Sequence, residues 1–178
     1  DVGPDGHMYF CVGGRKGQSY LYRIRYTGDN STALSELDTT SEHAKARKTR
    51  HLLESFHGGP SPKAIETAWP FLKSKDYHLR YAARIAIEWQ DPKTWADKAY
   101  DESNDLAAMH ALLGLARCDH PGSIQPSINR LLEVDFSKLN KTDKLALLRT
   151  YSVVMSRAGK PNQSQIYAIG NQLDKYFP

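Results

Sequence analysis

The sequence contains no long apolar run and only two cysteines. Because a membrane-spanning helix needs roughly 18 consecutive apolar residues, we predict no membrane span, and no basic and apolar leader opens the chain. The chain starts at Asp1 without an initiator Met, so we expect a fragment or a processed product. Cys11 and Cys118 lie far apart in the sequence, which argues against a disulfide framework and favours buried free thiols.

The motifs that hold cofactors are also missing. Covalent attachment of a c-type haem requires Cys-x-x-Cys-His, which does not occur. The histidines show no metal-binding spacing such as His-Glu-x-x-His, and scattered histidines are more often surface or core residues. They are His7, His43, His51, His57, His78, His110 and His120. We therefore predict no catalytic residue, no metal site and no cofactor within this chain.

The glycine-rich stretch "GGRKGQS", residues 13–19, lacks the order of a phosphate-binding loop. Such a loop ends in Gly-Lys-Ser/Thr and leads into a helix, whereas Lys16 here precedes Gly17 and a strand-like segment follows. Segments 7–12 and 20–26 are rich in aromatic and β-branched residues. We predict two strands, a hairpin connection whose glycines adopt positive φ, and a preceding turn in "GPDG". The alternation predicts a half-buried second strand with a buried face of Tyr20, Tyr22, Ile24 and Tyr26.

The chain is long enough for one globular domain with a short appendage. It has 178 residues, of which 40% are hydrophobic and 25% charged, and a net charge of +4. Much of that charge lies in "SEHAKARKTRH", where a basic patch outnumbers Glu42. Such a patch can attract nucleic acid or an acidic partner, but most charge runs are solvated helix faces, and nucleic acid is not the expected partner. The basic patch consists of Lys45, Arg47, Lys48 and Arg50.

A polar connector occupies residues 29–40. After it, the alternation typical of strands ends and residues typical of helix starts and helix ends appear. Thr39 and Glu42 are predicted to form a capping box at the first helix, which the Gly-Gly-Pro sequence at 58–60 ends. Ser61 is predicted to cap the next helix. A third helix is predicted to begin at Asp76. Its apolar residues form two faces, so we expect it to be packed on most sides. One face has Leu79, Ala82, Ala83 and Ala86, the second has Tyr81, Ile85 and Trp89, and a narrow charged stripe has Arg80, Arg84 and Glu88.

Helix-start signals recur along the rest of the chain. A proline stands at a predicted helix start at intervals of roughly 30 to 40 residues, and a second helix follows each of the first three prolines. Helix pairs at such a period are typical of an α-solenoid, in which each pair buries its apolar face against the next. The prolines are Pro62, Pro92, Pro121 and Pro161, and the second helices begin near Asp76, Asn104 and Asn140.

The segment "SPKAIETAWPFLKSKDYHLRYAARIAIE" resembles a HEAT-type repeat. The resemblance implies structural roles for Pro70, which bends the first helix, and for Asp76 and Arg80, which in such arrays commonly link the turns. We therefore expect a mostly α fold, a HEAT-like α-α superhelix with a short N-terminal β-hairpin. The expected organisation is a hairpin at 1–28, a linker at 29–40 and a helical repeat domain at 41–178.

Several motifs in order resemble a large family of bacterial proteins classed as membrane-bound dehydrogenases. These motifs are "GPDGHMYFCVGGR", "YLYRIRYTG", "RHLLESFHG", "AIETAWPFL", "LRYAARIAIEWQDPKTW" and "LDKYFP". Family members are similar to quinoprotein glucose and sorbosone dehydrogenases in a β-propeller, which HEAT-like helices and often a c-type haem domain follow. The resemblance implies that residues 1–28 are the last propeller strands of a periplasmic parent protein that uses a quinone and a c-type haem.

Two functions follow as hypotheses. The first is a non-catalytic HEAT-like scaffold that links the propeller to a haem-bearing region, with the rest of the parent chain as its protein partner. The alternative is a helical-repeat binder of nucleic acid or another polyanion through the basic patch. Asp5, His7 and Arg15 lie nearest the missing propeller and are the residues to watch for a substrate contact. An unpaired strand edge recruits other strands, so we expect the hairpin either to fold back onto the first helices or to form a homodimer.

Overall fold

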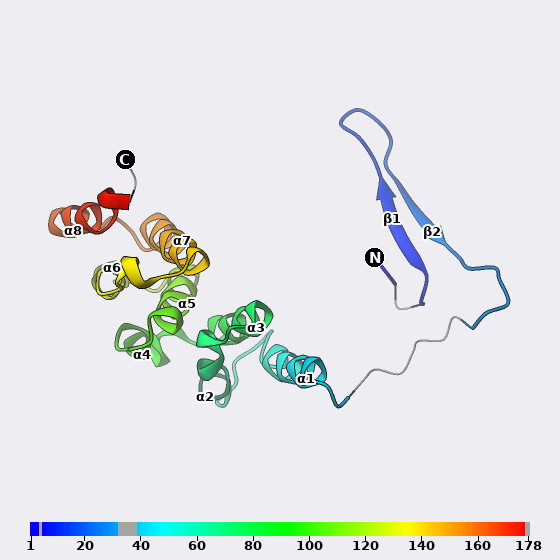
Figure 1. Cartoon of the computed structure of the whole chain (residues 1–178), viewed down its shortest axis with the longest axis horizontal. Coiled ribbons are helices and arrows are strands. Elements are labelled where there is room, and N and C mark those ends of the chain that lie inside the picture. Colours follow the sequence, from blue (N-terminus) through cyan, green and yellow to red (C-terminus); the bar gives the residue numbers. More distant parts are fainter. Residues whose placement is uncertain (4, 32–38, 177–178) are drawn as a thin grey trace. The chain divides into compact units, whose positions relative to one another are not determined.

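The computed structural model of the protein describes residues 1–3, 5–31 and 39–176 (Figure 1). Two compact units are distinguished, Asp1–Ala44 and Lys45–Pro178. Most of the connector predicted at 29–40 lies outside the described residues. Among the helices that are described, none is both long enough and apolar enough to cross a membrane.

The first unit is a two-stranded antiparallel hairpin, as the sequence predicted. β1 (Met8–Val12) pairs with β2 (Tyr20–Ile24), and Phe10 lies opposite Tyr22 with the two ring centroids 5.3 Å apart. Alternate residues of a strand point to the same side, so one side of the hairpin is wholly apolar or aromatic. We call this side the hairpin face: Met8, Phe10, Val12, Tyr20, Tyr22 and Ile24.

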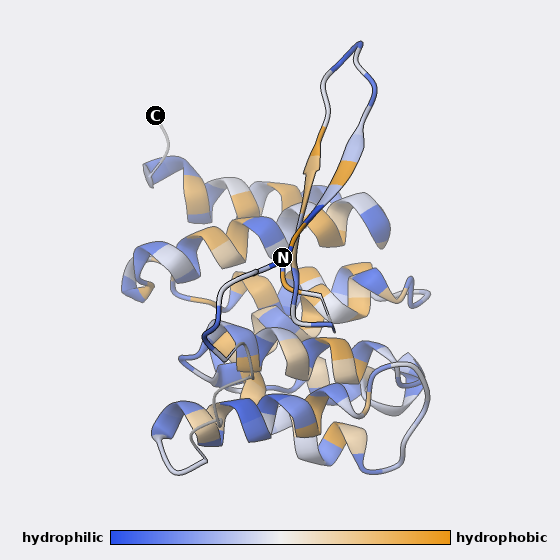
Figure 2. Cartoon of the chain, turned by 90° about the vertical axis from the view of Figure 1, so that its right-hand side faces the viewer, coloured by the Kyte–Doolittle hydropathy of each residue, from blue (hydrophilic) through white to orange (hydrophobic). Residues whose placement is uncertain are grey.

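The hairpin face is exposed within its unit, contrary to the burial predicted for Tyr20, Tyr22, Ile24 and Tyr26. Each of these four side chains is 46% to 52% exposed, and no described residue from 1 to 31 is buried. Two strands alone have no second layer to cover them, which is the physical reason for the exposure. Figure 2 shows the apolar strands beside the polar connection at the tip.

The glycines of the hairpin connection do not have the conformation that the sequence predicted. Gly6, in the turn before β1, has a φ of 75°, whereas Gly13, Gly14 and Gly17 do not have positive φ. Positive φ is required in the tightest two-residue hairpin turns. The strands here are joined by the longer segment 13–19, so its residues can reverse the chain without left-handed backbone.

The rest of the described chain is mostly helical. The α-helices are α1 (Glu42–Glu54), α2 (Ala64–Ala68), α3 (Tyr77–Glu88), α4 (Ala96–Tyr100), α5 (Asp105–Arg117), α6 (Ile124–Leu132), α7 (Lys141–Arg157) and α8 (Gln163–Leu173). Short 3₁₀ helices lie between or after them: η1 (Trp69–Lys73), η2 (Pro92–Thr94), η3 (Phe136–Lys138) and η4 (Asp174–Tyr176).

Three helix starts predicted from the sequence are confirmed. Asp76 caps α3, Asn104 caps α5 and Asn140 caps α7, in each case with a side-chain oxygen that accepts from backbone N–H groups of the first turn. These N–H groups have no partner within the helix itself, so a short oxygen-bearing side chain at this position stabilises the helix start. Asn162 and Gln165 form a full capping box at α8.

Two other predicted caps were wrong. At α1, the hydroxyl of Ser41 accepts from the backbone N–H of Ala44, and because the helix begins at Glu42 the capping box predicted for Thr39 is not formed. At α2, no side chain caps the helix, so Ser61 does not have its predicted role. Ser and Thr are frequent on both sides of these starts, and the pattern alone does not select the capping one.

Pro70 stands at a change of helix type. The α-helix α2 ends at Ala68, and Pro70 lies in the first turn of η1, which ends at Lys73. Proline lacks the amide proton needed for the next α-helical hydrogen bond, so the helix tightens instead of continuing. The predicted bend therefore takes the form of a switch from α-helix to 3₁₀-helix.

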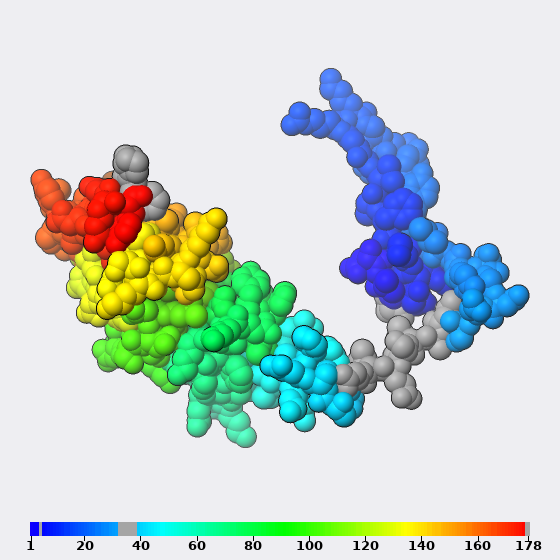
Figure 3. All heavy atoms as spheres, viewed as in Figure 1, coloured from blue at the N-terminus to red at the C-terminus, as the bar shows by residue number. Residues whose placement is uncertain are grey.

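Neighbouring helices of the second unit pack in two sets. α3 contacts α5 and α5 contacts α7, while α4 contacts α6 and α6 contacts α8. Within pairs, α2 contacts α3, α4 contacts α5 and α6 contacts α7, and Figure 3 shows the successive helices abutting without a break. We call α3, α5 and α7 the second-helix row. The core between the helices includes Leu72, Ile87, Met109, Leu112, Leu115, Ile128, Leu131, Leu147 and Val154.

The faces of α3 differ from the sequence expectation. The expected second apolar face is largely open, with Tyr81 49% and Trp89 50% exposed. The charged stripe lies inward instead, since Arg80 and Arg84 are buried and the side chain of Glu88 is only 12% exposed. Long arginine stems cover apolar surface while their charged ends find hydrogen-bond partners, so an arginine stripe can pack between helices.

Candidate functional site

The three residues proposed for substrate contact are not all brought together. Asp5 and His7 lie in the turn before β1, where the carboxylate of Asp5 accepts from the Tyr9 hydroxyl (2.6 Å) and from the His7 amide (3.2 Å). These hydrogen bonds lower the pKa of Asp5 from its usual value. Arg15 lies in the connection at the opposite end of β1. A five-residue strand spans roughly 17 Å, so Arg15 cannot share a small ligand with the other two.

The basic patch lies on α1, and its residues are not equally available. Arg50 is paired with Glu54 at 3.1 Å, and Arg47 is half-buried. Lys45 and Lys48 are exposed and stand three positions apart, on the same side of the helix. The patch thus presents two exposed lysines, which is a small footprint for a polyanion.

Asp76 and Arg80 both support the turn between η1 and α3, by separate contacts. The Asp76 carboxylate caps α3 through the amides of His78 and Leu79. Arg80 Nη1 donates to the carbonyl oxygens of Ser74 (2.6 Å) and Lys75 (3.0 Å). Among the described residues, no ion pair joins Asp76 to Arg80.

A groove of about 500 Å³ lies across the second-helix row. Its floor is polar and its rim carries rings and an arginine, so it combines charge with apolar surface. We call it the arginine groove. It is lined by Tyr77, Arg80, Tyr81 and Arg84 from α3, His110 and Leu113 from α5, and Thr142, Asp143, Leu145, Ala146, Arg149 and Thr150 from α7.

Two tyrosine rings flank the floor arginines. The guanidinium carbon of Arg84 lies 5.2 Å from the centroid of the Tyr81 ring, and that of Arg80 lies 5.9 Å from the Tyr77 ring. The two rings are stacked on each other with centroids 6.2 Å apart. Cation–π contacts of this kind hold a guanidinium without using its N–H donors, which stay available to a ligand.

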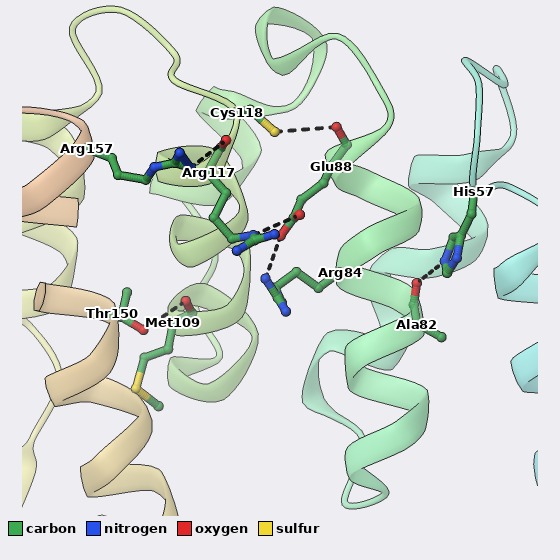
Figure 4. Close-up of polar contacts among 9 residues, drawn as sticks. All are labelled: His57, Ala82, Arg84, Glu88, Met109, Arg117, Cys118, Thr150 and Arg157. Atoms are coloured by element: carbon green, nitrogen blue, oxygen red, sulfur yellow. Dashed lines mark hydrogen bonds and ion pairs between the residues drawn. The ribbon is translucent and has the colours of Figure 1, made fainter. Parts of the chain in front are cut away.

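Arg84 is also part of a charged network between helices (Figure 4). Its Nη1 donates to Glu88 at 2.6 Å, and Arg117 Nε donates to the same carboxylate at 3.0 Å. Glu88 is thereby paired with Arg84 within α3 and with Arg117 on α5, and the Arg117 contact joins the two helices. Because the side chain of Glu88 is largely buried, these charge-assisted hydrogen bonds fix the position of Arg84 at the edge of the groove.

Further polar contacts hold α5 against its neighbours (Figure 4). The hydroxyl of Thr150 lies 3.4 Å from the carbonyl oxygen of Met109, and Arg157 Nη1 lies 3.4 Å from that of Arg117. Cys118 donates its thiol to the carbonyl oxygen of Glu88, and burial raises the pKa of this thiol to about 11. The thiol therefore stays protonated at neutral pH, which makes Cys118 a poor nucleophile.

His110 lies at the floor of the groove between α3 and α7. Burial, followed by the positive charges of Arg80 and Arg84, lowers the pKa of His110 to about 4, so the ring is neutral at pH 7. Its Nδ1 is enclosed and has no hydrogen-bond partner. An enclosed polar atom without a partner is unfavourable, so this position costs folding free energy.

Exposed aromatic residues continue beyond the groove along α3. Tyr77 is 60% exposed, Tyr81 49% and Trp89 50%, and their spacing of four and eight positions places them on one side of the helix. We call these three residues the aromatic stripe. Large exposed rings beside arginines have the composition of protein-binding surfaces.

Sequence reasoning missed the arginine groove. It assigned Arg80 a role in the turn and placed Arg84 with Glu88 in a charged stripe, but it had no means to bring His110 or Arg149 beside them. One available signal was Gly114 in the middle of α5, since a Cβ there would lie 3.4 Å from Glu88 and 3.5 Å from Arg84. A glycine inside a helix indicates that another element approaches closely.

Neither a metal-binding cluster nor a related protein identifies the function of the arginine groove. Within the part of the chain that the structure describes, no cluster of three or more His, Cys, Asp or Glu residues could hold a metal ion. Comparisons of the chain with protein-family models, with curated proteins and with solved structures find no match. The side chains of the groove combine guanidinium groups, which suit anions, with exposed rings, which suit apolar groups.

Proposed function

We propose that the helical unit is a HEAT-like repeat scaffold without catalytic activity that binds a protein partner on its second-helix row. The observation that carries the proposal is the packing order, in which α3 contacts α5 and α5 contacts α7 while α4, α6 and α8 form the other set. In a helical solenoid each pair contacts the next in this way, and the row of equivalent helices offers a continuous binding surface.

The side chains on this row favour a protein ligand. The aromatic stripe and Arg149 are exposed, and Tyr, Trp and Arg are the residue types that dominate binding energy at protein interfaces. The supporting contacts of Glu88 and Thr150 lie behind them, so the exposed residues stand on a fixed base. A surface that is ordered before binding loses less conformational entropy on association.

The alternative of polyanion binding through the basic patch is less favoured. Arg50 is engaged with Glu54, which leaves Lys45 and Lys48 as the exposed cations. Binding to nucleic acid releases counterions, so its affinity would fall steeply with salt, with a slope of roughly 0.9 per phosphate contact. A gel-shift series with duplex DNA at rising salt would detect such binding.

The scaffold is also proposed to be one segment of a larger protein. The sequence resemblance to the dehydrogenase family supports a scaffold that joins a β-propeller to a haem-bearing region in the periplasm. The exposed hairpin face supports docking of a further sheet, because large apolar side chains there are uncovered within their unit. The family relation itself rests on the sequence motifs alone.

Site-specific cross-linking tests the binding surface. A photoreactive p-benzoylphenylalanine replaces Tyr81 in one variant of the full chain and Lys93, an exposed residue of η2, in a matched control. We expect a protein of the source organism to be cross-linked from position 81 and not from position 93. After purification, that protein should bind the wild-type chain and bind Tyr81→Ala more weakly. Equal cross-linking from both positions, or none from 81, would contradict the proposal.

A further inference from the structure

We propose that the arginine groove binds an acidic peptide segment of the partner, with a Glu or Asp carboxylate held by Arg80, Arg84 and Arg149. This inference rests on the proposed function and adds the chemistry of the ligand. Three features of the groove support this inference: arginine N–H groups that have no hydrogen-bond partner, an excess of positive charge, and apolar side chains in the lining.

Several guanidinium donors in the groove have no partner. Among the described residues, Arg80 and Arg84 use only Nη1 for hydrogen bonds, although the two residues are only 8% and 9% exposed. The Nε atom of Arg80 is also unpaired but is enclosed, so the donors left for a ligand are the other N–H groups of the two guanidinium groups. A guanidinium presents N–H groups in a planar fork that matches the two oxygens of a carboxylate, so these donors suit that group.

Arg149 adds a third cation at the rim. Its side chain is exposed, and within the described residues no carboxylate oxygen lies within 4.0 Å of it. An arginine that makes no contact in the free protein loses no existing ion pair when a ligand binds. Together with the floor arginines it approaches the ligand from α7, opposite α3.

The carboxylates nearest the groove are already engaged. Asp143 lines the groove, but its side chain accepts from Asn140 Nδ2 at 2.7 Å at the start of α7. Glu88 lies between Arg84 and Arg117. With these two carboxylates beside four arginines, Arg149 included, positive charge remains in excess. Charge complementarity therefore favours an acidic ligand.

The remaining lining indicates a peptide more than a free anion. The groove has a volume of about 500 Å³, within the range of roughly 300–1,000 Å³ that is typical of ligand pockets, and a carboxylate group fills a small part of it. Tyr77, Tyr81 and Leu145 line its upper part and are at least 49% exposed. Their apolar surface suits the apolar side chains that flank an acidic residue in a peptide.

Peptide selection tests the ligand class. A phage library of random twelve-residue peptides is selected against the full chain, and the most enriched sequence is synthesised with a fluorescent label. We expect enrichment of Asp or Glu next to Leu, Phe or Tyr. The dissociation constant, measured by fluorescence anisotropy, should rise at least tenfold for Arg149→Glu and stay within twofold for the control Lys93→Ala. Both positions are exposed, so the fold is expected to be retained, and circular dichroism verifies this.

Two altered peptides identify the chemical group. Replacement of the acidic residue by Gln removes the charge while keeping the shape, and binding should weaken at least tenfold. Replacement by phosphoserine adds charge and a tetrahedral group. If the phosphopeptide binds tenfold more tightly than the acidic peptide, the groove is a phosphate site and the carboxylate assignment is wrong.

The outcomes separate this inference from the proposed function. Enriched peptides without acidic residues that lose affinity in Tyr81→Ala, and not in Arg149→Glu, would overturn the inference and leave the scaffold proposal standing. If no peptide is enriched, or if neither substitution changes binding, the inference fails. The cross-linking result from position 81 then decides the scaffold proposal independently.

Discussion

Arg80 lines the arginine groove and also holds the turn between η1 and α3. Replacement by Ala removes both hydrogen bonds to the carbonyl oxygens of Ser74 and Lys75 and leaves these oxygens without that partner. Hydrogen bonds from a charged donor contribute about 1.5–3 kcal/mol, so we expect Arg80→Ala to lower the free energy of unfolding by about 1–3 kcal/mol. Urea unfolding followed by circular dichroism measures this change.

Arg149→Ala is the matched control for Arg80→Ala. Arg149 lines the same groove but is exposed and makes no hydrogen bond among the described residues. Surface substitutions of this kind usually change stability by less than about 0.5 kcal/mol. Equal stability of the two variants would show that the Arg80 contacts with the turn are not stabilising.

The lowered pKa of His110 is expected to make the protein less stable in acid. Its pKa is about 4 in the folded protein and near 6.5 when unfolded, so between these values the unfolded chain binds more protons. Stability that is present above pH 6.5 is therefore lost as the pH falls towards 4. At about 1.4 kcal/mol per pKa unit the loss is roughly 3 kcal/mol. Urea unfolding at successive pH values should show it, and His110→Gln should reduce it.

His78 supplies the control for this pH dependence. It lies on α3 and is exposed, so His78→Gln changes the same residue type without changing the groove floor. We expect the wild-type slope of stability against pH to be retained in His78→Gln. A slope that persists unchanged in His110→Gln would mean that another group titrates, and the account of His110 would be wrong.

At the level of elements, the side chains that cap the helices of the second-helix row are expected to contribute to stability. The side-chain oxygen of Asn104 accepts from the amide of Ala107 at 3.0 Å at the start of α5. Loss of such a cap costs about 1 kcal/mol, within a range of 0.5–2. Asn104→Ala should lower the thermal midpoint accordingly, whereas Asn171→Ala, within α8, should not lower it, because alanine favours a helix interior.

Helix starts and the hairpin could be predicted because their causes are local. An Asp or Asn oxygen caps the backbone a few residues away, and alternating residues define a strand wherever it lies. The face of α3 could not be predicted in this way. The apolar character of Tyr81 and Trp89 predicts burial, yet both are exposed. Arg84 packs inward instead, beside Gly114 of α5, which lies 30 residues further along the chain.

The arginine groove illustrates the same limit for function. Arg80 and Arg84 stand one turn apart and could be placed together from the sequence. His110 and Arg149 come from helices about 30 and 65 residues further on, and only the packing of α3, α5 and α7 makes them neighbours. A site composed of side chains from three helices leaves no contiguous motif.

At the scale of the whole molecule, the hairpin predicts self-association. Its face has six apolar or aromatic side chains that are at least 42% exposed. Residues 1–2 pair with the start of β1, but among the described residues no third strand covers the rest of the outer edges. We expect the full chain to form a dimer through the strands, and deletion of residues 1–28 to make it monomeric in light scattering. Arg15→Ala, at the hairpin tip, is the control and should remain dimeric.

The deletion also distinguishes the other arrangement of the hairpin. If it folds back onto the helices, the deleted chain should instead lose thermal stability with no change in oligomeric state. A chain that is indifferent to the deletion in both measurements would show that the hairpin supports neither arrangement. The docking role proposed for the hairpin face would then have no support.

The two cysteines differ in a way that makes the hairpin chemically addressable. Contrary to the burial predicted for both thiols, Cys11 is exposed on β1, on the side of the strand opposite Phe10, and Cys118 is half-buried. The thiol of Cys118 donates to the carbonyl oxygen of Glu88 and stays protonated at neutral pH. A maleimide dye or spin label at neutral pH therefore attaches to Cys11 in the unmodified sequence. The reporter on the strands therefore needs no engineered residue, and a second label introduced on a helix would allow the distance from the hairpin to that helix to be measured in solution.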